Sequence, residues 1–159
     1  MPEIAFYHHT RGSVEQTLPT LLERSLARGW RVVVQAASAR RVKALDAHLW
    51  SYRPESFLPH GTKADGAPET QPVYLTCEED NPNRADVRFF VERARMAPAL
   101  VGEAAPAIRA ALLFDGADDE ELADARAQWK ELRELGYSLV YHQQSESGGW
   151  EEKAREPKV

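Results

Sequence analysis

The sequence predicts one α/β domain, with a central, mostly parallel sheet and helices on both faces. Short apolar runs alternate with helical patterns along the chain, an order typical of parallel strands joined by helices. The run Val32–Val34 is apolar at every position, as expected of a strand covered on both faces. The length of 159 residues suits a single core, because most domains hold roughly 100–150 residues.

The first half of the chain predicts strand, helix, strand and helix in that order. Ile4–His8 is rich in β-branched and aromatic residues and predicts the first strand, and Val32–Val34 predicts the second. Each predicted helix begins after a serine that can cap it, and they run from Ser13 to Gly29 and from Ser38 to about Trp50. Pro19 either kinks the first helix or marks a late start.

The second half continues the alternation. A short strand or an extended segment is expected at Phe57–Pro59, and further strands are expected at Pro72–Thr76, Val87–Val91, Ala111–Phe114 and Tyr137–Tyr141. Gly61–Pro72 predicts a surface loop, and short helical turns are expected at Pro98–Glu103 and Pro106–Ala110. Asp118 begins the last long helix and Gly136 ends it. The domain is expected to cover residues 1–144, followed by a flexible tail over residues 145–159.

Composition excludes several classes of function. The net charge of -5 repels the phosphate backbone, so any role with DNA is expected to be indirect. The single cysteine, Cys77, disfavours disulfides and structural zinc, and favours a reducing compartment. The chain has no apolar run of about 18 residues, and Met1–Glu3 begins no signal peptide. A cytoplasmic protein with no membrane contact is expected.

The Rossmann-like layout makes a small nucleotide-dependent enzyme the first catalytic hypothesis. That hypothesis rests on fold analogy alone, because the segment His8–Ser13 lacks the glycine-rich pattern of a phosphate-binding loop. His8 and His9 point to opposite faces of a strand and cannot both bind one metal ion. The acids from Asp115 to Glu121 suit helix capping better than magnesium binding. We therefore expect no catalytic residue, no metal site and no cofactor.

The helix expected after Asp118 separates its charges by face. At about 100° per residue, three cations fall about 20–80° from Leu122, namely Arg126, Lys130 and Arg133. The acids fall at about 120–200°, namely Asp124, Glu131 and Glu134. The apolar sector that faces the core contains Ala125, Leu132 and Leu135.

Trp129 lies at about 340°, between the core sector and the cations. A large aromatic ring beside three cations can receive a peptide with an apolar tip and carboxylates. The same pattern also suits an ordinary amphipathic helix with Trp129 in the core and solvated cations. A further alternative is a weak single-strand binder that stacks bases on Trp129.

A second candidate surface follows the second predicted helix. The segment from Leu49 to Gly61 contains Trp50, Phe57 and two prolines but no catalytic constellation. Large aromatic side chains held by rigid prolines are typical of an interface hot spot. The segment therefore predicts a protein docking surface.

Taken together, these segments resemble the chi subunit family of bacterial DNA polymerase III holoenzymes. The resemblance runs from about residue 4 to residue 141, and its ordered motifs are Phe6-Tyr7, Val14-Glu15-Gln16, Gly29, Leu45-Asp46, Leu49-Trp50, Pro54, Ser56-Phe57, Pro59-His60, Ala125-Arg126, Trp129-Lys130, Arg133 and Gly136-Tyr137. It implies a non-catalytic, clamp-loader-associated subunit that captures the acidic, phenylalanine-ending C-terminal tail of single-stranded DNA-binding protein.

The resemblance also implies roles for individual residues. Arg126, Lys130 and Arg133 would meet the carboxylates of the tail, and Trp129 would help to form the phenylalanine pocket. Trp50 and Phe57, supported by Pro59, would face the psi subunit or another clamp-loader subunit. Leu122 stands where the family can have a further lysine, and the segments Gly61–Pro72 and 145–159 match the family poorly.

Overall fold

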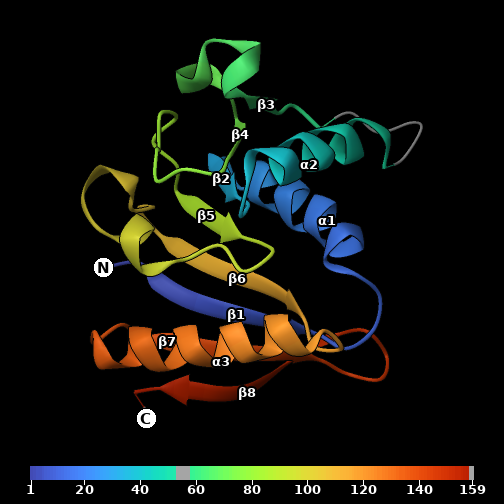
Figure 1. Ribbon diagram of the computed structural model, residues 1–159, viewed down its shortest axis with the longest axis vertical. Helices are drawn as coiled ribbons and strands as arrows, with labels where there is room; N and C mark the ends of the chain where they lie inside the picture. Colours follow the sequence, from blue (N-terminus) through green and yellow to red (C-terminus); the bar gives the residue numbers. More distant parts are fainter. Residues whose placement is uncertain (53–57, 158–159) are drawn as a thin grey trace.

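The computed structural model describes residues 1–52 and 58–157, which form one eight-stranded sheet flanked by helices (Figure 1). The strand order is β3-β4-β2-β5-β6-β1-β7-β8. The strands are β1 (Glu3–His9), β2 (Val32–Gln35), β3 (Gly61–Thr62), β4 (Val73–Thr76), β5 (Val87–Phe90), β6 (Arg109–Asp115), β7 (Leu139–Gln144) and β8 (Trp150–Glu156). All neighbours pair in parallel except β7 and β8. The predicted α/β class with a mostly parallel sheet is confirmed.

The three α-helices begin where the predicted caps place them. They are α1 (Val14–Ala27), α2 (Ala39–Ser51) and α3 (Asp119–Glu134). The Ser13 and Ser38 hydroxyls each accept a backbone hydrogen bond from the first turn, and the Asp118 carboxylate accepts two. These bonds satisfy amide groups that have no partner within the helix. Helix α1 starts at Val14 and includes Pro19, so the proline does not delay it.

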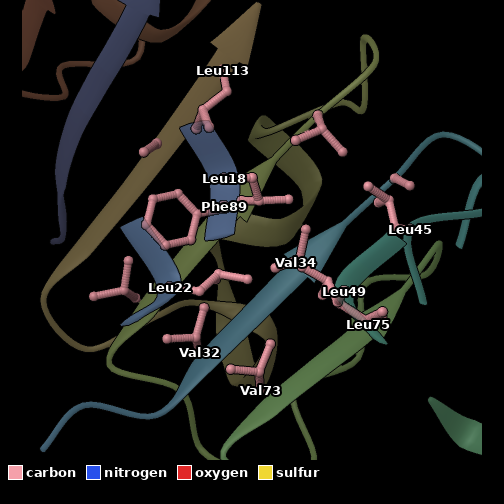
Figure 2. Close-up of a cluster of buried hydrophobic side chains, with 14 of the residues drawn as sticks. Leu18, Leu22, Val32, Val34, Leu45, Leu49, Val73, Leu75, Phe89 and Leu113 are labelled. Carbon is pink, nitrogen blue, oxygen red and sulfur yellow. The ribbon is translucent and has the colours of Figure 1, made fainter. Parts of the chain in front are cut away.

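The sheet separates two hydrophobic clusters. On one face α1 and α2 contribute Leu18, Leu22, Leu45 and Leu49, which pack on strand residues such as Val34 (Figure 2). On the other face α3 packs with the short 3₁₀ turns η3 (Ala97–Leu100) and η4 (Gly102–Ala104). Alternate residues of β1 enter opposite clusters, with Ala5 in the first and Phe6 in the second. Helices therefore cover both faces, as predicted.

Two local predictions differ from the structure. Gly61–Thr62 forms the edge strand β3 inside the segment predicted as a loop, and its two residues pair with β4. Arg109 and Ala110 belong to β6 and not to a helical turn, because they pair with both β1 and β5. Phe57 lies outside the described residues, and Leu58 and Pro59 belong to no strand. The remaining predicted strands are present, with shifts of a few residues at their ends.

The end of the chain also differs from its prediction. Residues 150–156 form β8, which pairs antiparallel with β7 after a tight reversal closed by the Ser145 amide donating to the Gly149 carbonyl at 2.7 Å. Trp150 holds the strand in place, since its ring packs edge-on against Tyr7 and His9 at centroid distances of 5.1 and 5.0 Å. This segment is a strand where the sequence predicts a frayed tail, and the domain boundary at residue 144 stays a prediction.

Candidate functional site

Helix α3 is held in one rotation about its axis by a buried glutamine. Gln128 is 4% exposed, its Oε1 accepts from the Met96 amide at 2.9 Å, and its Nε2 donates to the Ala94 carbonyl at 3.1 Å. Ala125 and Leu132 are buried on the same side. Because these contacts fix the buried side of α3, they also decide which of its residues face outward.

Two acids on the acidic side of α3, Asp124 and Glu131, have partners within the molecule. Glu131 pairs with Arg95 at 2.7 Å, and Asp124 accepts from the Gln128 amide at 2.8 Å. In the first turn of the helix, Glu120 pairs with Arg93 at 3.2 Å. The residues Arg93 and Arg95, just before η3, thus provide cations for the acids of α3.

The cationic side of α3 has no such partners. Arg126, Lys130 and Arg133 are exposed, and none of them forms an ion pair with another residue of the described chain. We call these three side chains the α3 cationic stripe. Its charges remain available to an anionic partner. Because the three side chains are exposed, salt should weaken their attraction to that partner.

Trp129 joins this stripe to the core. Its ring is half-buried and meets Phe6 edge-on at 5.2 Å and Tyr141 at 5.6 Å. Edge-to-face geometry is the arrangement that aromatic pairs prefer. The structure thus places Trp129 between core and surface, as the helical spacing predicts. Leu135 is predicted to face the core, but it lies at the end of the helix and is 57% exposed.

Two residues beside Trp129 were not singled out as site residues by the sequence. His8 Nδ1 and the Tyr141 hydroxyl lie 2.8 Å apart, and both rings contact Phe114. Burial lowers the pKa of His8, and the positive charge of Arg126 lowers it further. Burial raises the pKa of Tyr141, with Arg126 opposing the shift. Arg126 therefore acts on an aromatic cluster that only the pairing of β1 with β7 brings together.

The predicted docking surface lies elsewhere on the molecule. Trp50 is 58% exposed near the end of α2, Pro59 is half-buried, and Phe57 lies outside the described residues. Helix α2 contacts β3 and β4 at one end of the sheet, whereas α3 contacts β6 and β7 on the opposite face (Figure 1). The structure therefore keeps the two predicted sites apart.

A buried histidine supports the docking segment. The His60 side chain is fully buried; its Nδ1 lies 2.7 Å from the Leu58 carbonyl and its Nε2 lies 3.0 Å from Asp46 Oδ1 of α2. The His60 and Asp46 side chains are close enough for an ion pair, but the two atoms do not form a hydrogen bond. The Trp50 ring lies 4.9 Å from the His60 ring. His60 thus fastens the segment after residue 57 to α2, directly beneath Trp50.

A cleft of about 580 Å³ lies where α1, α2 and α3 begin, at the carboxyl ends of the central strands. This edge is where open α/β sheets bind ligands. Here the cleft is lined by six acids, and Arg41 within it is paired with Glu92 at 2.5 Å and with Glu15 at 3.4 Å. Such a lining repels phosphate and does not favour the nucleotide-dependent alternative.

The acids after β6 act as helix caps. Asp118 Oδ1 accepts from the Glu120 and Glu121 amides at 2.9 and 3.1 Å, and Asp115 accepts from the Ala117 amide at 2.9 Å. Across the described residues, no group of three or more His, Cys, Asp or Glu side chains is arranged to hold a metal ion. In the same part of the chain, no helix has the length and apolar character needed to cross a membrane.

Comparison with known proteins connects this arrangement to a family. The family model described as "DNA polymerase III chi subunit, HolC" matches residues 1–140. A Pseudomonas aeruginosa protein named "DNA polymerase III subunit chi" is 30% identical over 131 residues, covering 77% of this chain and 80% of its own. A Rickettsia prowazekii protein named "Probable DNA polymerase III subunit chi" is 29% identical over 100 residues, covering 63% of this chain.

The match to the Rickettsia protein spans 61% of that relative's length. The family match, by contrast, includes all of β1 through α3 and reaches into β7, so it contains both the α3 cationic stripe and Trp50. The match covers 140 of the 159 residues, so membership rests on most of the domain and not on one motif. The chain belongs to the chi subunit family of DNA polymerase III.

Proposed function

We propose that this chain is a non-catalytic adaptor that links the replicative polymerase to single-stranded DNA-binding protein. The α3 cationic stripe would receive the carboxylates of that protein's acidic C-terminal tail, and Trp129 would help to hold the terminal phenylalanine. The observation that carries the proposal is that Arg126, Lys130 and Arg133 lack ion-pair partners in the described chain, while the neighbouring acids Glu120 and Glu131 pair with arginines.

The geometry supports this occupant over a purely structural role. A stripe that served only solubility would need no half-buried aromatic ring beside it, yet Trp129 lies against Tyr141 and Phe6 at the edge of the stripe. Arginine also suits carboxylates because its planar fork can donate two parallel hydrogen bonds. A peptide with acidic residues and an aromatic end matches both features.

Titration of a fluorescent tail peptide tests the proposal. Removing two exposed ion pairs of about 0.2–1 kcal/mol each predicts a loss of up to about 30-fold for Arg126→Ala combined with Lys130→Ala. A matched control, Arg24→Ala with Arg28→Ala, removes the same charge from α1 on the opposite face. Tail capture at α3 would be overturned if the wild type and the α3 double variant bound the peptide with equal affinity. It would also be overturned if the α1 and α3 double variants lost affinity equally.

We also propose that Trp50, with Pro59 and with Phe57, docks the chain onto the psi subunit or another clamp-loader subunit. The exposed indole of Trp50 is supported from beneath by His60, which is how a hot-spot side chain is held ready for a partner. Trp50→Ala is expected to abolish co-purification of clamp-loader subunits while tail-peptide affinity stays unchanged. Co-purification that survives this change would contradict the assignment.

A further inference from the structure

A small hollow on the α1 face is surrounded by arginines. It has a volume of about 160 Å³ and lies at the amino ends of the central strands, between the C-terminal part of α1 and the starts of β5 and β6. Arg24 and Arg28 reach it from α1, and Arg109 reaches it from β6. Water occupies about 30 Å³ per molecule, so the space of about five waters is available to a phosphate group.

The lining has an unusual charge for this chain. The chain has a net charge of -5, yet none of the described residues that line the hollow is acidic. Arg109 has one ion pair, to Glu3, at the limiting distance of 4.0 Å. Its buried Nε has no hydrogen-bond partner in the described chain. Three arginine residues therefore line one space that no described acidic residue lines.

Helix capping explains only part of this cluster. Cations in the last turn and beyond the end of a helix are favoured by its macrodipole, which accounts for Arg24 and Arg28 on α1. It does not account for Arg109, which comes from the sheet. A second feature suited to ligand binding is the pair of aromatic rings in the lining, Tyr7 and Trp30.

Arg28 and the two rings are also held in place before any ligand arrives. The Arg28 guanidinium lies over the Trp30 ring at 4.9 Å from its centroid. Tyr7 stacks on His142 of β7 at 5.1 Å. Burial raises the pKa of Tyr7, with Arg109 and Arg28 opposing the shift, so both cations lie within electrostatic reach of its hydroxyl. Such preorganisation reduces the entropy lost on binding.

We propose that this hollow binds a phosphate group of a single-stranded nucleic acid, with Arg24, Arg28 and Arg109 contacting the phosphate and Trp30 available to stack a neighbouring base. Arginine forks match phosphate geometry, and base–aromatic stacking tolerates any sequence. The site lies on the face opposite α3, so it is separate from the tail site and does not depend on it. A free phosphate or nucleotide offers the same chemistry and is distinguished below.

Salt dependence gives a quantitative test with the full chain. For single strands the slope of log K against log salt is about -0.7 per neutralised phosphate, so the one phosphate in the hollow contributes about -0.7. Affinity for a fluorescein-labelled oligothymidylate, followed by anisotropy, should fall roughly threefold between about 50 and 200 mM salt. In Arg24→Ala with Arg28→Ala, the affinity should be lower and its salt dependence should be weaker than in the wild type. Arg109→Lys keeps the positive charge but removes the planar guanidinium group, which can donate two parallel hydrogen bonds to a phosphate. Thermal melting checks that this variant folds.

Arg126→Ala with Lys130→Ala is the matched control, because it removes the same charge from the opposite face and should keep the wild-type slope. The site would be overturned if the salt dependence weakened equally in both double variants, or only in the α3 double variant. Absence of oligonucleotide binding at low salt would overturn it as well. Displacement of the oligonucleotide by inorganic phosphate supports the oxyanion site. Phosphate binding without any oligonucleotide binding refutes a nucleic acid strand as its source.

Discussion

Truncating Trp129 should destabilise the fold as well as the proposed tail site, and the size of the loss follows from its packing. Full burial of a large aromatic makes its change to alanine cost about 3–5 kcal/mol, and half-burial reduces this to about 2 kcal/mol. Two edge-to-face pairs, with Phe6 and Tyr141, add about 0.5–1.5 kcal/mol each, part of which overlaps with the area already counted. We expect Trp129→Ala to lose about 3 kcal/mol.

Urea unfolding followed by circular dichroism measures this loss, and a melting temperature lower by about 6–12 °C should accompany it. Trp50→Ala is the matched control, since the same substitution at a side chain that is 58% exposed should cost about 1 kcal/mol or less. Trp129→Phe should recover most of the stability, because a smaller ring can keep the edge contact with Phe6. A loss below about 1 kcal/mol for Trp129→Ala, or equal losses at both positions, would refute the packing argument.

The remaining predictions concern buried polar groups. Arg88 is fully buried and donates to Gln35 Oε1 and to three backbone carbonyls. Arg88→Met should therefore lower the free energy of unfolding by about 3–5 kcal/mol in urea titrations, and a loss under about 1 kcal/mol would contradict this. Burial lowers the pKa of His9 and of His142, so below about pH 6.5 the unfolded chain binds more protons than the folded chain. The free energy of unfolding should then fall as the pH drops from about 7 to 5 until these groups protonate in the fold; a flat profile would argue against neutral, buried imidazoles.

The sequence predicts features whose causes are local. Ser13, Ser38 and Asp118 identify the helix starts because a cap and its amide partners lie within three residues of each other. The charge separation of α3 follows from helical spacing alone, which puts Arg126 and Lys130 on one side without any tertiary contact. The apolar run of β2 predicts a strand covered on both faces, and all four of its residues are buried.

Features decided by distant partners could not be predicted in this way. The charges of β8 and Gly148-Gly149 resemble a frayed end, and only pairing with β7 and the contact of Trp150 with Tyr7 make the segment a strand. The hollow joins Arg24 and Arg28, which helical spacing relates, to Arg109, which no local spacing relates to them. Leu135 satisfies the apolar pattern of α3, yet the helix ends there and leaves it exposed.

The separation of the two cores explains how one small chain could serve two partners at once. The cluster under α2 and the cluster under α3 share no residue, because alternate side chains of each strand enter opposite faces. A change at Trp50 therefore has no shared partner with a change at Lys130, and effects at such sites add. A partner bound at α2 would leave the α3 cationic stripe as it was, so the proposed adaptor could hold one protein while it captures the other.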